Sequence, residues 1–396
     1  MEQKLVVAAD FGNGKIAMAA AHKQDDGTLE LIDFKQVKSK IDLIKDGKIV
    51  DVTALASAVT ELINQIENDN NLQIGKFHFA TAPHTLRSEI CKFSIDFSGS
   101  QDSDAERLKN DASNHIISDT RRVFGVVQLE TGFAMKSEGN FLIVSVQNAV
   151  KEKINSINSS TLSLYKPKDF IAPLVEAEQF LTANQKKNGS LLVDFGAGCT
   201  SFAVYQNGFP RLCAVVPFGS EHITSDIIKT FRVGKNHADE LKTSPKYGLA
   251  TTSNLTIGEI SIKADELKSV ISARLKEIFN LIFEEIKNQK IENIKEIVLT
   301  GGGSKLRFLP EFLTNFSKTE VKHIDFNIIT NEKNKDFINP ENSLLLALLK
   351  KCNEDCKKIE IKPAQPLPNT KKPPKPPRET IWDLFSEKKE TKFEKL

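Results

Sequence analysis

Two segments of the chain carry the residue types that bind a polyphosphate and its cation. Near the N-terminus an apolar run ends at Asp10 and leads into Phe11-Gly12-Asn13-Gly14-Lys15. Far downstream a second apolar run ends at Asp194 and leads into Phe195-Gly196-Ala197-Gly198-Cys199-Thr200. A further apolar run follows each segment, so we predict two β-hairpins whose tight turns expose backbone N–H groups.

Two such turns that face each other would form a nucleotide clamp, because they hold a polyphosphate from both sides. Asp10 and Asp194 would position Mg²⁺ through its water molecules, since this cation loses water reluctantly. Asn13 can supply a polar contact to a phosphate, and Lys15 can place a positive charge beside it. For either loop alone, a simpler interpretation stays open, in which the aspartate caps an ordinary turn.

A third glycine segment, Gly301-Gly302-Gly303-Ser304, follows a buried strand expected at 296–300. Glycines at this place let the backbone lie against a large planar or sugar-phosphate group, although a plain strand-to-helix turn is the alternative. The segment is not a GxGxxG dinucleotide motif. The chain also has no GxxxxGK[ST] motif, which excludes the P-loop class of enzymes.

The elements around the two loops follow the same order, three strands and then a helix, which predicts an internal duplication. In the first copy a further strand follows at 77–82. The expected strands are 4–12, 15–21 and 29–37 in the first copy and 190–194, 202–205 and 212–217 in the second. The expected helices are 52–67 and 221–231.

Residues 87–166 interrupt this order and predict an inserted small α/β module. We expect a polar helix at 102–117, strands at 124–134 and 140–146, and a helix at 148–158. Outside this module the apolar spacing predicts helices at 173–183, 264–287 and 344–349.

The composition bounds the class of protein. A length of 396 residues predicts two to four structural units, and 40% hydrophobic with 27% charged residues is typical of a soluble globular protein. A net charge of +2 gives no global field that would favour nucleic acid. The five cysteines form no framework, which favours a reduced cytosolic setting, and Cys352 and Cys356, one helical turn apart, lack a second ligand pair for a metal.

The last residues differ from the rest. Residues 361–378 are rich in Pro and carry five positive charges without an acid, which predicts an extended linker. Residues 379–396 predict an amphipathic helix that inserts at the membrane headgroup boundary, although a protein-docking motif is the alternative. The residues that would insert are Ile381, Trp382, Leu384, Phe385 and Phe393.

The three glycine segments together resemble those of a known superfamily. Residues 10–15, 194–200 and 300–304 match, in order, the phosphate-1, phosphate-2 and adenosine motifs of the actin-like ATPases. Within that superfamily the chain resembles the FtsA family of bacterial cell-division proteins, most strongly from about 165 to 315. The closer resemblance lies in residues 191–204, 216–227, 238–248, 271–278 and 297–313.

The resemblance implies an α/β fold of the actin-like (ASKHA) class, with two duplicated ribonuclease-H-like domains, a nucleotide cleft and an inserted small α/β subdomain. The first domain would comprise 1–86 and 167–190, and the second core 191–227 and 296–360. The inserted subdomain would be 87–166, the outer subdomain of the second half 228–295, the linker 361–378 and the terminal helix 379–396.

The resemblance also implies the ligands and partners. The cofactors would be ATP and Mg²⁺. The protein would polymerise at the division site, on the cytoplasmic face of the inner membrane, and tether the FtsZ ring there. Its partners would be the FtsZ C-terminal peptide, further copies of itself, inner membrane lipid and, through the inserted subdomain, other divisome proteins.

The resemblance assigns residues to these ligands. Arg232 and Lys235 could meet the peptide, although a solvated face is the alternative. Asp239 and Lys242 match positions that contact the nucleoside. The remaining nucleotide-binding residues would be Gly12, Asn13, Gly14, Lys15, Gly196, Gly198, Cys199, Thr200, Gly301, Gly302, Gly303 and Ser304.

One departure bears on catalysis. Efficient polymerising ATPases of the superfamily place Glu or Gln near the helix that follows the inserted region, where it orients the attacking water. This chain has Ile171-Ala172 ahead of Pro173, and Glu176 one turn later is only a weak candidate for that task. We therefore predict ATP binding with slow or no turnover.

Two alternative functions stay open. One is a PilM-type pilus-assembly ATPase that binds a short peptide of a membrane protein. The other is a sugar or acetate kinase, or a polyphosphatase, with the same two-domain clamp. Such an enzyme needs a base on the substrate side, and the sequence shows no convincing Asp or His near the loops.

Overall fold

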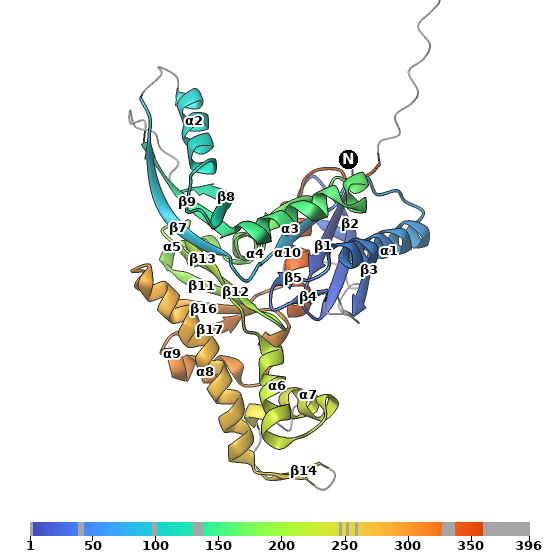
Figure 1. Cartoon of the computed structure of the whole chain (residues 1–396), viewed down its shortest axis with the longest axis vertical. Helices are drawn as coiled ribbons and strands as arrows, with labels where there is room; N and C mark the ends of the chain where they lie inside the picture. Colours follow the sequence, from blue (N-terminus) through green and yellow to red (C-terminus); the bar gives the residue numbers. More distant parts are fainter. Residues whose placement is uncertain are drawn as a thin grey trace, which may run out of the picture. The chain divides into compact units, whose positions relative to one another are not determined.

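The computed structural model describes residues 3–38, 43–96, 101–129, 138–244, 248–250, 253–257, 260–326 and 337–358. The described residues up to 358 form one compact unit (Figure 1), and the structure describes none of residues 359–396. The predicted linker and the predicted membrane helix, with Ile381, Trp382, Leu384, Phe385 and Phe393, therefore lie outside the described residues.

The first half of the chain builds a five-stranded sheet in the order β10-β6-β1-β2-β3. Strand β1 runs antiparallel to β2 and parallel to β6. Its central position explains its composition, because a strand that is covered on both faces reads as a continuous apolar run. The strands are β1 Lys4–Phe11, β2 Lys15–Lys23, β3 Leu29–Lys38, β6 His78–Thr81 and β10 Lys168–Ile171.

The second half repeats this sheet with the order β13-β12-β11-β16-β17. Strand β11 again runs antiparallel to its hairpin partner β12 and parallel to β16. The predicted internal duplication is therefore confirmed at the level of topology. The strands are β11 Ser190–Phe195, β12 Thr200–Gln206, β13 Phe209–Val216, β16 Glu296–Thr300 and β17 Glu320–His323.

The two hairpins also share their register. Phe11 pairs with Ile16 across the first turn, and Phe195 pairs with Thr200 across the second, so both turns have the same length. Asp10 and Asp194 consequently occupy equivalent places, one residue before the end of each strand.

Helices cover the outer faces of the sheets and fill the space between them. Helix α1 packs against β2 and β3, while α6 and α8 pack against each other and share a core with the second sheet (Figure 1). Helices α4 and α10 pack against each other; α4 contacts the second sheet and α10 the first. Their bounds are α1 Val52–Asn70, α4 Ala172–Phe180, α6 Ser220–Phe231, α8 Ala264–Asn288 and α10 Ser343–Lys351.

The helix predicted at 173–183 ends three residues earlier than predicted, and a second helix begins at its last residue. Helix α4 ends at Phe180, and Thr182 starts α5 (Ala183–Asn188) with a capping box to Gln185. A threonine at this place favours the start of a new helix, because its side chain accepts a hydrogen bond from a free amide in the first turn. Helix α10 likewise ends before Cys352, so Cys352 and Cys356 are not one helical turn apart; both are buried free thiols.

The inserted region forms a three-stranded sheet in the order β7-β9-β8, with α2 packed on it. Helix α2 ends four residues earlier than predicted, at Ser113, and β8 begins at Arg121 and ends at Gln128 rather than spanning 124–134. The elements are β7 Arg87–Ser94, α2 Gln101–Ser113, β8 Arg121–Gln128, β9 Glu138–Gln147 and α3 Asn148–Ser159.

The C-terminal end of the inserted region packs against the first sheet. Ile157 of α3 and Leu162 of the short helix η1 (Thr161–Tyr165) lie in the core of the first sheet, with Leu5 and Val7. The domain boundaries given above stay a prediction.

The remaining elements are short. A two-stranded hairpin, β4 (Ile44–Lys45) and β5 (Lys48–Ile49), turns through Asp46-Gly47, both with positive φ. The others are α7 Lys235–Thr243, η2 Gly248–Ala250, β14 Leu255–Ile257, β15 Ile260–Ile262, η3 Gly302–Lys305, α9 Leu309–Ser317 and η5 Pro340–Asn342. Among the helices that the structure describes, not one has the length and apolarity needed to cross a bilayer.

Candidate functional site

The turns of the two hairpins line one cavity of about 650 Å³. The cavity gathers residues that lie far apart in the sequence, from both halves of the chain. Of the residues predicted to bind nucleotide or metal, it is lined by Asp10, Gly12, Asn13, Gly14, Lys15, Asp194, Gly196, Gly198, Cys199, Asp239, Lys242, Gly301, Gly302 and Gly303.

Both turns close in the same way. The amide of Gly12 donates to the carbonyl of Lys15 at 3.0 Å, and that of Gly196 donates to the carbonyl of Cys199 at 3.1 Å. The turns also contact each other, because a Cβ on Gly198 would lie 2.4 Å from the side chain of Asn13. Glycine is thus required at 198 by close approach rather than by a positive φ.

The turn amides are available to a ligand. Within the described part of the chain, the N–H groups of Asn13, Gly14, Ala197 and Gly198 make no hydrogen bond. All four residues line the cavity. Successive free amides in two facing turns are a site for phosphate oxygens.

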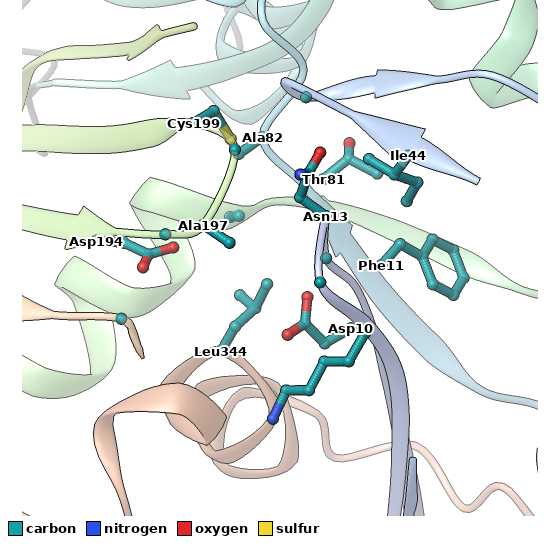
Figure 2. Close-up of a pocket in the computed structure, with 18 of the residues that line it drawn as sticks. Asp10, Phe11, Asn13, Ile44, Thr81, Ala82, Asp194, Ala197, Cys199 and Leu344 are labelled. Carbon is teal, nitrogen blue, oxygen red and sulfur yellow. The ribbon is translucent and has the colours of Figure 1, made fainter. Parts of the chain in front are cut away.

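The two aspartates face the cavity from opposite hairpins. Figure 2 shows the carboxylates of Asp10 and Asp194 pointing into the space between the two strands that carry them. Burial raises the pKa of Asp10 to about 6, against the opposing effect of Lys15. Burial, together with the charge of Asp10, raises the pKa of Asp194 to about 7.

Glu176 lies beneath them and does not line the cavity. Its side chain is fully buried, and its Oε1 accepts a hydrogen bond from Ser343 Oγ at 2.7 Å. Burial raises the pKa of this carboxyl well above its ordinary value, and the charges of Asp194 and Asp10 add to the effect. The role of Glu176 in orienting a water molecule stays a prediction.

This arrangement fits Mg²⁺ and a polyphosphate. The charge of Asp10 raises the pKa of Asp194, and both aspartates raise the pKa of Glu176. The ammonium of Lys15 already donates a hydrogen bond to Asn342 Oδ1 at 2.7 Å. A divalent cation between Asp10 and Asp194 would lower their mutual repulsion. A phosphate chain would then accept from the free turn amides.

Asn13 joins the first turn to the second half of the molecule. Its Nδ2 donates to Glu221 Oε2 at 2.8 Å, and its Oδ1 accepts from the amide of Asp46 at 2.7 Å. Glu221 lines the cavity and was not predicted as a site residue. Its place in the first turn of α6, just after a glycine, was the only available signal.

Asp239 and Lys242 form a polar cluster at the cavity wall. Lys242 Nζ donates to Thr224 Oγ1 at 2.8 Å, and Thr224 donates to Asp239 Oδ1 at 2.8 Å. Burial lowers the pKa of Lys242, while Asp239 opposes this shift.

The third glycine segment closes over Asp194. Gly301 has a φ of +82°, and a Cβ there would lie 2.1 Å from Asp194 Oδ1. A side chain at 301 would therefore displace the carboxylate.

Besides Glu176, four predicted site residues among the described ones do not line the cavity. Thr200 and Ser304 are buried, and their hydroxyls donate to the backbone carbonyls of Phe218 and Gly301. Arg232 and Lys235 are exposed, and neither forms an ion pair with another described residue. Arg274, by contrast, is held by Asp226 at 2.7 Å and by Glu277 at 2.6 Å.

The cavity extends beyond the clamp, along the β4–β5 hairpin and α3. The residues of this part were not predicted from the sequence, because no motif marks them and the fold alone brings them together. They include Lys38, Lys48, Thr81, His84 and Lys153.

The paired sheets, the two facing hairpins and the cleft between them define an actin-like ATPase fold. Two solved structures share it. The PilM-PilN type IV pilus biogenesis complex has a TM-score of 0.65 at 14% identity, over 87% of this chain and 97% of that chain. MreB5 of Spiroplasma citri, bound to ADP, has a TM-score of 0.51 at 13% identity, over 87% of this chain and 94% of that chain.

Sequence comparison finds similarity to one family of cell-division proteins. Residues 191–347 match the family model for the cell division protein FtsA. The chain is 25% identical over 344 residues to FtsA of Buchnera aphidicola (subspecies Baizongia pistaciae), covering 78% of this chain and 80% of that protein. It is 24% identical over 359 residues to FtsA of Escherichia coli K12, covering 81% and 84%. The chain is therefore similar to FtsA cell-division proteins over about four fifths of its length, and its fold is actin-like.

Proposed function

We propose that this protein binds ATP with Mg²⁺ between its two hairpins and acts as a filament-forming scaffold of cell division. In this role it tethers FtsZ to the inner membrane. The family supports the setting in cell division, and the ADP bound to the Spiroplasma citri protein of the same fold supports the nucleotide. The observation that carries the proposal is the pair of equivalent hairpins that present Asp10 and Asp194 to one cavity.

Equilibrium binding of a fluorescent ATP analogue with Mg²⁺ tests the nucleotide site. We expect Asp10→Ala and Asp194→Ala each to weaken binding at least tenfold, about 1.4 kcal/mol, because each removes a ligand of the hydrated cation. Asp111→Ala is the matched control, since Asp111 is exposed on α2 and does not line the cavity. Unchanged affinity in both cavity variants would refute the proposal.

The start of α4 supports slow turnover. Ala172 lines the cavity there and has no group to orient a water, while Glu176 is hydrogen-bonded to Ser343 below the cavity. We expect steady-state ATP hydrolysis below about 1 s⁻¹, the low end for kinase-like phosphoryl transfer. Faster hydrolysis by the purified protein would show that another group positions the water.

The FtsZ C-terminal peptide is the proposed partner of the outer part of the second half. Arg232 and Lys235 are exposed there, at the junction of α6 and α7, and they suit an acidic peptide. A pull-down with the immobilised peptide should retain the wild-type protein and lose the double variant Arg232→Ala, Lys235→Ala. Lys109→Ala on α2 is the control. If the immobilised peptide does not retain the wild-type protein, the result would indicate a different partner, such as a peptide of a membrane protein.

Filament formation is the last part of the proposal. We expect electron microscopy on lipid monolayers to show filaments with ATP and Mg²⁺ and none without nucleotide. If filaments form equally well without nucleotide, filament assembly does not depend on nucleotide binding between the hairpins.

A further inference from the structure

We propose that this protein holds a small monovalent cation, Na⁺ or K⁺, beneath the nucleotide clamp, among the side-chain oxygens of Asp194, Ser201, Thr300 and Glu176. This site is distinct from the Mg²⁺ position between the hairpins. It needs no nucleotide, so it stands or falls separately from the function proposed above.

Three of the four residues lie in one row across the second sheet. Asp194 on β11 pairs with Ser201 on β12 and with Thr300 on β16. Residues paired across neighbouring strands point to the same face of a sheet. Their side chains therefore stand side by side at the end of the sheet nearest the cavity.

The alternation along the strands identifies that face. Leu192, Ala203 and Val298 belong to the core that contains α4 and α10. Each residue of the polar row lies two positions from one of these three on the same strand: Asp194 from Leu192, Ser201 from Ala203 and Thr300 from Val298. Side chains two residues apart on a strand share a face. The polar row therefore faces α4, the helix that carries Glu176.

The oxygens of this group are not satisfied within the protein. Ser201 Oγ, Thr300 Oγ1 and Glu176 Oε2 are buried and have no hydrogen-bond partner among the described residues. Each of these three residues is at most 1% exposed. Several buried, unpartnered oxygens in one place require an explanation, and an ordered ion or water is the usual one.

The duplicated first half provides an internal comparison. The residues that pair with Asp10, at the places of Ser201 and Thr300, are Ala17 and Ala80. The fold therefore accepts alanine at both positions. The hydroxyls of the second half are not required by the architecture, which points to a ligand.

Charge favours a cation over a water molecule. The four residues of the proposed site include two carboxyl groups, Asp10 adds a third nearby, and Lys15 is already bonded to Asn342. Hydroxyl and carboxylate oxygens that replace a hydration shell suit a monovalent ion.

The melting temperature of the full-length protein tests the site in EDTA without nucleotide. Chloride salts of K⁺, Na⁺ and tetramethylammonium would be compared at about 150 mM, so that ionic strength is constant. We expect K⁺ or Na⁺ to raise Tm by about 2–3 °C over tetramethylammonium, which is too large to enter, because a ligand that binds only the folded state stabilises it.

Variants test whether the difference in Tm between salts arises from Ser201 and Thr300. Thr300→Val replaces the hydroxyl with a methyl group and should abolish the difference between salts, as should Ser201→Ala, while Thr300→Ser should retain it. Ser190→Ala is the matched control, because Ser190 is buried on the same strand as Asp194 and its hydroxyl already donates to Gln185 at 2.7 Å.

The proposal is overturned if the wild-type Tm is the same in all three salts, or if the difference survives in both Thr300→Val and Ser201→Ala. Crystals grown with Tl⁺ in place of K⁺ provide a direct measurement. An anomalous peak among the four side chains supports the site, whereas an ordered water alone at that position refutes it.

Discussion

The carboxylates of Asp10 and Asp194, at the centre of the cavity, lower the stability of the folded protein and favour the binding of a cation. Asp10 and Asp194 would be more stable apart, because each is enclosed and each repels the other when ionised. Their arrangement becomes favourable only with a cation between them. Without a cation, the protein carries a cost in stability that depends on pH.

The pH dependence of Asp194→Asn follows from this cost. The pKa of Asp194 is about 7 in the folded state, above the ordinary 3.8, so the folded state binds more protons than the unfolded state between about pH 4 and pH 7. The free energy of unfolding falls as pH rises through that range, and asparagine avoids the loss. We expect Asp194→Asn to raise the Tm of the nucleotide-free protein by about 2–4 °C at pH 8 and to change it little at pH 5.

Thermal melts at the two pH values, with Asp111→Asn as the control, check this expectation. The same variant should bind Mg²⁺ and ATP at least tenfold more weakly. A Tm that falls at pH 8 would contradict the assigned repulsion.

Gly198 tests the contact between the two turns. An alanine there would place its Cβ 2.4 Å from the Asn13 side chain, so Asn13 must move and its bond to Glu221 is lost. We expect Gly198→Ala to weaken ATP binding about tenfold or more, measured by isothermal titration. Gly234→Ala is the control, because its Cβ would meet nothing within 4 Å. Equal affinities for the two variants would show that the turns do not meet in solution.

At the scale of elements, α10 depends on a lysine from the opposite end of the chain. Lys23 is 8% exposed, and its Nζ donates to the carbonyls of Lys350 and Cys352 and to Asn353 Oδ1. The ammonium thus caps the C-terminus of a helix whose N-terminus lines the cavity. The cap joins β2 to α10 without a partner carboxylate.

Removing this cap should destabilise the protein. Lys23→Met leaves buried carbonyls without a donor, and we expect a loss of about 1–3 kcal/mol in the free energy of unfolding. Urea denaturation measures it, with Lys109→Met on the exposed side of α2 as the control. A loss no greater than that of the control would mean that water replaces the ammonium.

At the scale of the whole molecule, the cross-packing of α4 and α10 joins the two halves. The α4 of the first half lies on the second sheet, and α10 lies on the first, so neither half can bury its core alone. The cleft is therefore built on the contact between these helices.

Membrane attachment, by contrast, is expected to depend on residues beyond this unit. Deletion of residues 381–396 should abolish co-sedimentation with anionic liposomes, because it removes the proposed apolar face of the terminal helix. ATP binding should be unchanged, since the cavity lies in the unit 1–358. Unchanged sedimentation would instead support the protein-docking interpretation of this segment.

Much of the clamp could be predicted from the sequence because local patterns encode it. An apolar strand, an aspartate and glycines predict a hairpin wherever they occur, and both hairpins form as predicted. The orientation of single side chains was less predictable. Thr200 and Ser304 sit in the right turns, but their hydroxyls bond to the backbone instead of facing the cavity.

The sequence by itself determined the duplication, the two turns, the glycine segment that follows β16 and the resemblance to FtsA, since each depends on residues close together along the chain. Only the tertiary structure decided that Glu221 bonds to Asn13, that Glu176 bonds to Ser343 and that three buried oxygens near Asp194 have no partner among the described residues. The physical reason is that the bonds of Glu221 and Glu176 join segments more than a hundred residues apart. Local propensity carries no information about which of them meet, because packing between sheets and helices fixes it.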